Sequence, residues 1–154
     1  MLSIDDVRGI VTKALMEAFG SRVVAAVLFG SVARCEVSER SDIDLFVVVD
    51  DLHKDPIERR LVIYRALSSV RAGLKRDTSI IDADVKDLAE GELTSLLINI
   101  AWDGVVLYDK DGYVTRLLKR IKDTIGEAKL IRYRTRDGKY GWKPSKPSRI
   151  TLRV

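Results

Sequence analysis

The chain has 154 residues, a net charge of +4 and a hydrophobic content of 46 %. This length suffices for one domain with a buried core, and the composition excludes a disordered or fibrous protein. No apolar run is long enough to cross a membrane and no signal pattern is present, so we expect a cytoplasmic protein without membrane contact. With one cysteine (Cys35) and one histidine (His53), any metal must be bound by carboxylates, which favour Mg²⁺ or Mn²⁺.

Positive charge is concentrated in residues 129–154, which contain nine Lys or Arg residues and a single acidic residue, Asp137. This stretch therefore carries +8 and leaves −4 for residues 1–128. We predict a main domain over residues 1–128, followed by a basic extension over 129–154 that is part of the same domain or partly disordered. Basic stretches can contact nucleic acid, although a solvated surface is their more common role.

The first half of the chain alternates between helical and strand patterns. Ser3 can cap a helix that ends near Gly20, and the apolar runs 23–29 and 43–49 are typical of two buried, neighbouring strands. A short helix or turn is expected at residues 31–34. Pro56 suits the start of a long helix that ends near Gly73. This helix is predicted to continue through Ile57, Leu61, Tyr64, Leu67 and Val70.

The second half continues the same mixture. We predict a strand over residues 78–85, a helix capped by Asp87, a strand over 105–108 and an amphipathic helix over 111–127. The inner face of the helix after Asp87 is predicted to hold Leu93, Leu96, Leu97 and Ile100. Beyond residue 129 the pattern weakens into a loop between Pro144 and Pro147, and residues 150–154 are typical of an edge strand or a disordered end.

A phosphate site is expected where the first buried strand turns into the short helix. Gly30 has no Cβ, so an anion can approach the backbone closely, and amides at the start of a helix point outward. The Ser31 hydroxyl would lie beside this cradle. Arg34 can reach a triphosphate or pair with Glu36 or Glu39, because the guanidinium group serves phosphates and carboxylates alike.

A pair of carboxylates lies about ten residues after Gly30 and Ser31, at the start of the second strand. Side chains alternate along a strand, so Asp42 and Asp44 share one face and Ile43 points into the core. Two carboxylates at this spacing can hold two divalent ions, which serve phosphoryl transfer by activating the attacking hydroxyl and stabilising the leaving group.

A third carboxylate is expected from the strand over residues 78–85. We predict Asp82, because Asp82 and Asp84 share a face while Ile81, Ala83 and Val85 share the opposite one. Asp77 and Asp84 are the alternatives, since a slip of one residue in so short a strand reverses the face that each side chain occupies.

The string from Gly30 to Glu36, followed by Ser41-Asp42-Ile43-Asp44-Leu45, resembles the signature of the minimal nucleotidyltransferases in the DNA polymerase β superfamily. The resemblance implies an α/β (α+β) fold with a small mixed β-sheet flanked by helices. It also implies that Gly30 and Ser31 handle the triphosphate, and that Asp42 and Asp44 bind metal with a third-strand acid. Cys35 stands where the family usually has glycine, which favours an altered loop.

The resulting hypothesis is a nucleotidyltransferase that transfers a nucleoside monophosphate to a protein or small-molecule hydroxyl. AMP from ATP is the first choice and another nucleoside triphosphate the alternative. Small members of this family often pair with a helical toxin, so the resemblance suggests an antitoxin. Two other hypotheses are a binding module that has the fold without catalysis and a nucleic-acid binder that uses the basic extension. A homo-oligomer is compatible with an exposed sheet edge.

Overall fold

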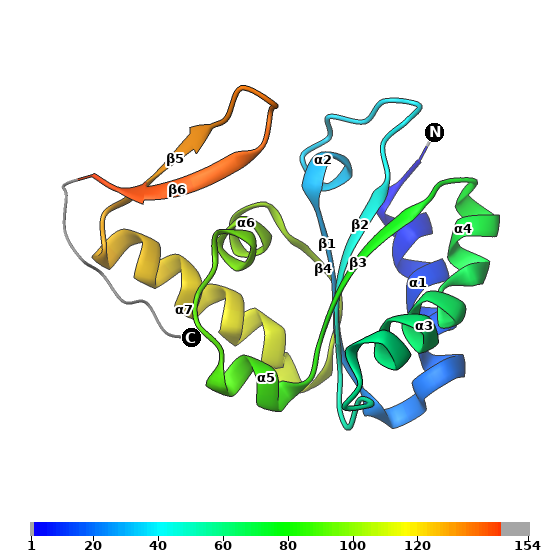
Figure 1. The fold of residues 1–154 in the computed structure, drawn as a ribbon. Coiled ribbons are helices and arrows are strands. Elements are labelled where there is room, and N and C mark those ends of the chain that lie inside the picture. Colours follow the sequence, from blue (N-terminus) through cyan, green and yellow to red (C-terminus); the bar gives the residue numbers. More distant parts are fainter. Residues whose placement is uncertain (1, 146–154) are drawn as a thin grey trace.

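The computed structural model describes residues 2–145 and contains one four-stranded mixed sheet with helices on both faces, plus a separate C-terminal hairpin (Figure 1). The order of the strands in the main sheet is β3-β2-β1-β4. This confirms the predicted fold class. The strands of the sheet are β1 (Val23–Phe29), β2 (Ile43–Val49), β3 (Thr78–Ala83) and β4 (Val105–Asp109), and the hairpin strands are β5 (Leu130–Arg134) and β6 (Tyr140–Pro144).

The two central strands lie where the apolar runs predicted them. β1 pairs antiparallel with both β2 and β4, whereas β2 pairs parallel with β3. Every residue of β1 is buried, and in β2 only Asp44 is partly exposed. A strand with both faces covered needs apolar residues at consecutive positions, which explains the continuous apolar runs.

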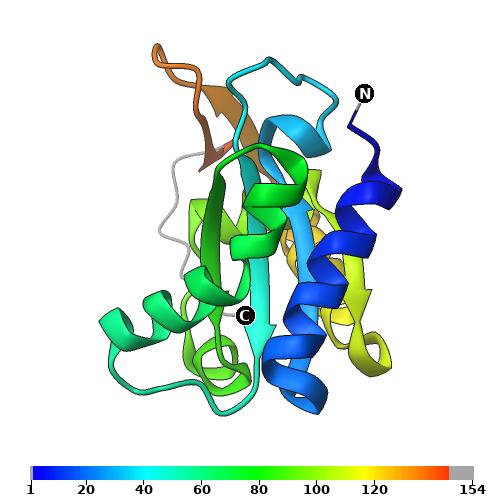
Figure 2. The same ribbon diagram turned by 90° about the vertical axis from the view of Figure 1, so that its right-hand side faces the viewer.

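One face of the sheet is covered by α1 (Ile4–Phe19), α3 (Pro56–Ala66) and α4 (Ser68–Leu74). Figure 2 shows this layer from outside, with α1 in blue and α4 in green in front of the sheet. The single helix predicted after Pro56 is in fact two, because the chain bends at Leu67. Leu67 and Val70 are buried, whereas Ile57, Leu61 and Tyr64 are exposed, and Ile63 is the buried residue of α3.

The other face is covered by α5 (Val85–Glu90), α6 (Ser95–Asp103) and α7 (Tyr113–Glu127). The inner face of α7 is the predicted one, since Val114, Leu117, Leu118, Ile121 and Ile125 are all buried. The helix predicted to start at Asp87 is again two helices. Asp84 caps α5 with Asp87 at its third position, and Thr94 caps α6. Leu96 is exposed, and the buried residues of α6 are Ile98, Ile100 and Ala101.

The C-terminal hairpin was not predicted. β5 and β6 pair antiparallel across a turn at Gly138, and the hairpin packs against α6 and α7 (Figure 1). The predictions for Pro147 and residues 150–154 lie outside the described residues. Within residues 2–145, no helix is long and apolar enough to cross a membrane.

Candidate active site

Gly30 and Asp44 meet at the end of the sheet where β1 stops and β2 begins. Phe29 is the strand partner of Asp44, and Gly30 follows it with a φ of +74° at the start of α2 (Gly30–Ala33). A Cβ at Gly30 would lie 2.9 Å from Asp44 Cγ and closer still to Oδ2. Glycine is therefore needed here both for the left-handed backbone and to leave room for the Asp44 carboxylate.

Asp42 and Asp44 lie together, as the strand spacing predicted. Asp44 belongs to the face of β2 that also carries Phe46 and Val48, and Asp42 precedes the strand on the same side. Burial, together with the negative charge of Asp42, raises the pKa of Asp44 to about 6, although Arg34 opposes the shift. Two carboxylates that disfavour each other's charge form a site that a hard divalent cation would stabilise, so the donor set fits Mg²⁺ or Mn²⁺.

Asp82 does not join this pair, which contradicts the prediction that it is the third acid. In the parallel register Asp82 lies opposite Val47, whereas Asp44 lies opposite Ser79. Three residues separate the two levels, or about 10 Å along the strand. The Asp82 side chain is also on the opposite face of the sheet, where Arg59 of α3 forms an ion pair with it at 3.6 Å.

The two alternative acids have different surroundings. Asp84 is buried, and its carboxylate accepts hydrogen bonds from the amides of Lys86 and Leu52, so it serves as a helix cap. Asp77 is exposed. Its backbone lies close to Asp42 and Asp44, because the amide of Ile43 donates to the Asp77 carbonyl at 2.9 Å. In the part of the chain that the structure describes, no three acidic, His or Cys side chains converge as a metal site.

Arg34 lies beside the site and is paired with acids. Its Nε donates to Glu36 at 3.1 Å and its Nη1 donates to Asp103 at 3.2 Å, while its side chain is 22 % exposed. The predicted pairing with Glu36 is thus present, and Asp103 at the end of α6 is a second partner that sequence reasoning missed. These bonds use Nε and Nη1, so the Nη2 donors are available to a ligand.

The loop that joins α2 to β2 keeps a glycine-like conformation without glycine. Cys35 has a φ of +59°, in the left-handed region that glycine adopts readily, and its side chain is exposed. The substitution of the family's glycine by Cys35 therefore retains a turn rather than removing it. The Glu36 amide donates to the Ser31 carbonyl at 2.8 Å and closes this turn.

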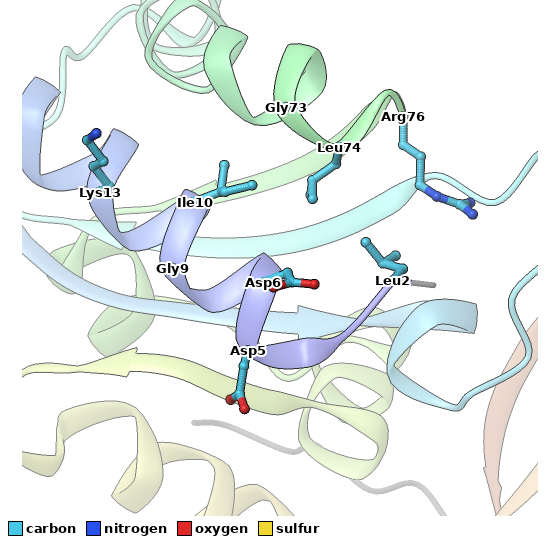
Figure 3. Close-up of a pocket in the computed structure, with 9 residues that line it drawn as sticks. All are labelled: Leu2, Asp5, Asp6, Gly9, Ile10, Lys13, Gly73, Leu74 and Arg76. Carbon is cyan, nitrogen blue, oxygen red and sulfur yellow. The ribbon is translucent and has the colours of Figure 1, made fainter.

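Arg76 supports the same loop from the other side of the sheet. Its Nη1 donates to the carbonyls of Ser38 and Ser41, each at 2.9 Å, and Ser41 is the residue directly before Asp42. Arg76 also lies at one end of a groove of about 730 Å³ between α1 and α4, with Lys13 at the other end (Figure 3). This groove lies on the face opposite Asp44, so it is not the cleft in which the carboxylate pair works.

The mixed sheet, the glycine turn and the carboxylate pair together are typical of proteins that transfer phosphorus-containing groups. The family model for polymerase β nucleotidyltransferases matches residues 12–113. The chain therefore belongs to the polymerase β nucleotidyltransferase family, and it is a nucleotidyltransferase.

Known proteins support this assignment. A Methanocaldococcus jannaschii protein, whose name proposes protein adenylyltransferase activity, is 30 % identical over 115 residues, which cover 75 % of this chain and 78 % of the relative. A solved toxin–antitoxin structure with AMP-PNP contains a chain of the same fold, with a TM-score of 0.57 at 19 % identity over 78 % of this chain and 87 % of that one.

A second solved structure has the same fold. It is a complex of a tri-AMPylated Shewanella oneidensis HEPN toxin with its MNT antitoxin, and the TM-score is 0.53 at 18 % identity over 80 % of this chain and 87 % of that one. At such identities the two structures establish the fold of this chain, while the family match and the M. jannaschii relative establish its family.

Proposed function

We propose that this enzyme transfers AMP from ATP to a hydroxyl group on a protein. The observation that carries the proposal is the Asp42 and Asp44 pair packed against Gly30, which also lines an open cavity. The choice of AMP and of a protein acceptor is supported by the name of the M. jannaschii relative and by the modified toxin in the S. oneidensis complex.

Asp42 and Asp44 are the residues that would hold Mg²⁺ or Mn²⁺. Bound there, the metal would neutralise charge at the reacting phosphorus and on the leaving pyrophosphate. Mg²⁺ is often held by only one or two carboxylates, with substrate phosphates and water as its other ligands. Two carboxylates are therefore sufficient for a site that is completed by the nucleotide itself.

The remaining residues of the site have supporting tasks. Gly30 and Ser31 allow the triphosphate to approach the backbone at the start of α2, and Arg34 offers free guanidinium donors beside them. Loop closure by Cys35 and Glu36, together with the hydrogen bonds from Arg76, fixes the position of Asp42. A substrate protein would meet this end of the sheet, where the carboxylate pair is accessible.

The proposed role in the cell is that of an antitoxin that modifies a helical toxin. It is supported by two fold neighbours that come from toxin–antitoxin structures. The rival role as a nucleic-acid binder has less support, because Arg132 of the basic extension is engaged by the Asp103 carboxylate inside the protein.

The test is transfer of label from ATP in an extract of the cells in which the protein occurs, with Mg²⁺ present. Label from [α-³²P]ATP should enter a protein band, and label from [γ-³²P]ATP should not. The Asp42→Asn and Asp44→Asn variants should lose the transfer, whereas Asp123→Asn, which removes an equal charge from exposed α7, should keep it. Equal labelling by the wild type and both site variants would refute the proposal.

A further inference from the structure

The C-terminal hairpin begins 17 residues after the end of the family match at residue 113. It is nevertheless attached to α6, whose last residue, Asp103, pairs with Arg34 of the candidate site. Asn99 of α6 donates from Nδ2 to the Tyr140 carbonyl at 3.0 Å and accepts from Trp142 Nε1 at 2.8 Å. Trp142 also packs edge-on against Trp102 of α6, with ring centroids 5.5 Å apart. These contacts set the hairpin at a defined position over α6.

The buried carboxylate of Asp103 connects the hairpin to Arg34, which follows the short helix α2. Arg132 of β5 binds Asp103 with two guanidinium nitrogens, Nη1 to Oδ1 and Nη2 to Oδ2, while Arg34 donates to Oδ2 at 3.2 Å. The Asp103 side chain is only 8 % exposed. A buried carboxylate between two arginines holds both guanidinium groups in fixed orientations, because leaving it unpaired in the interior is costly.

The hairpin turn and the segment from Gly30 to Arg34 line an open cavity of about 380 Å³. The Tyr140 ring lies at its wall, with Arg132 Cζ 3.7 Å and Arg34 Cζ 5.0 Å from the ring centroid. Residues from the strand end, the loop, α6 and the hairpin line it together, among them Phe29, Gly30, Arg34, Leu96, Lys139 and Tyr140. The cavity thus opens directly beside the glycine at which a triphosphate is expected. Arg34 and Lys139 line it together with Asp103, whose negative charge is paired with Arg34 and Arg132.

We propose that the C-terminal hairpin is part of the triphosphate site: the cavity takes the β- and γ-phosphates, and Arg132 and Asp103 are positioning residues that hold Arg34 beside them. The proposal rests on the proposed function, since it assigns a place to the leaving pyrophosphate of that reaction. A free arginine side chain loses considerable rotamer entropy when it binds a ligand. The Asp103 contact removes much of this cost before the nucleotide arrives.

A purely structural role for the same contacts makes a different prediction. If Arg132 and Asp103 only attach the hairpin, their loss lowers stability and leaves the choice between nucleotides unchanged. If they position Arg34 for the outer phosphates, their loss weakens ATP binding and leaves AMP binding intact, because AMP lacks those phosphates. Comparing the two nucleotides therefore separates positioning from general loosening of the fold.

The experiment measures dissociation constants of ATP and AMP by calorimetry with Mg²⁺, using the full chain. Arg132→Gln and Asp103→Asn should each weaken ATP about tenfold, the scale of one well-placed charge-assisted hydrogen bond, and change AMP less than about twofold. Lys143→Gln is the matched control: it removes the same charge from the hairpin, but Lys143 is exposed and does not line the cavity, so this variant should bind both nucleotides like the wild type.

Two results would overturn the proposal. One is that Arg132→Gln and Asp103→Asn bind ATP as tightly as Lys143→Gln does; the other is that both variants lose ATP and AMP affinity equally. If either occurs while the wild type transfers AMP and Asp44→Asn does not, the proposed function stands and the role of the hairpin falls. A wild type that binds neither nucleotide would overturn both.

Discussion

Replacing Asp44 by asparagine should stabilise the metal-free protein at neutral pH while it abolishes transfer. The carboxylate has a pKa of about 6 instead of its ordinary 3.8, so the folded protein binds a proton at this site more tightly than the unfolded chain. The stabilisation by that proton is complete below pH 3.8 and is lost as the pH rises through 6. Above that range wild-type Asp44 is an ionised, partly buried carboxylate next to Asp42, whereas asparagine carries no charge.

The size of the effect follows from the same shift. The change in pKa would amount to about 3 kcal/mol for a fully buried group, and partial exposure to solvent reduces this, so we expect about 1 to 2 kcal/mol. Urea unfolding in EDTA would measure it between pH 4 and pH 8. Asp44→Asn should exceed the wild type most at pH 8 and should approach it near pH 4. Mg²⁺ and ATP added together should then stabilise the wild type and leave the variant nearly unchanged.

Two outcomes would refute this reasoning. If Asp44→Asn is less stable than the wild type at pH 8, the carboxylate makes favourable contacts whose stabilisation exceeds the cost of burying its charge. A stability difference that does not depend on pH would show that it arises from packing and not from the proton. Asp123→Asn, an exposed change of the same charge on α7, serves as the control.

Three further substitutions test the site. Gly30→Ala should cost at least about 1 to 2 kcal/mol in urea unfolding, from its left-handed φ alone, and should reduce AMP transfer because the new methyl group displaces Asp44. Cys35→Gly should fold at least as stably as the wild type, whereas Cys35→Val should lose about 1 kcal/mol in the same assay, since a β-branched residue resists a φ of +59°. Asp82→Asn should keep its label transfer, because Asp82 lies on the other face of the sheet beside Arg59; loss of transfer would place Asp82 at the metal site.

The parts of the fold that the sequence predicted are those with a strong local signal. β1 and β2 are continuous apolar runs because both of their faces are covered, and α7 has an apolar stripe at helical spacing. Asp42 and Asp44 follow from the alternation of side chains within one strand. None of these inferences requires knowledge of which elements meet in space.

The parts that were wrong or missed depend on contacts between distant segments. Asp82 faces away from the carboxylate pair because of the register of β3 against β2, which the sequence of a short strand does not determine. The hairpin was missed because Arg132 faces inward, where apolar residues are expected. Its charge is tolerated only because Asp103, 29 residues earlier, is there to receive it.

The absence of a third acid beside Asp42 and Asp44 in the described residues changes how the site must work. Two carboxylates form a weak metal site on their own. One of them, Asp44, has a pKa of about 6, so below that pH it holds a proton that metal binding must displace. Triphosphate oxygens supply both the missing ligands and the missing negative charge, so metal and nucleotide should bind together rather than in sequence. On this view Arg34 and the hairpin that positions it contribute to metal binding indirectly, by holding the triphosphate whose oxygens complete the coordination.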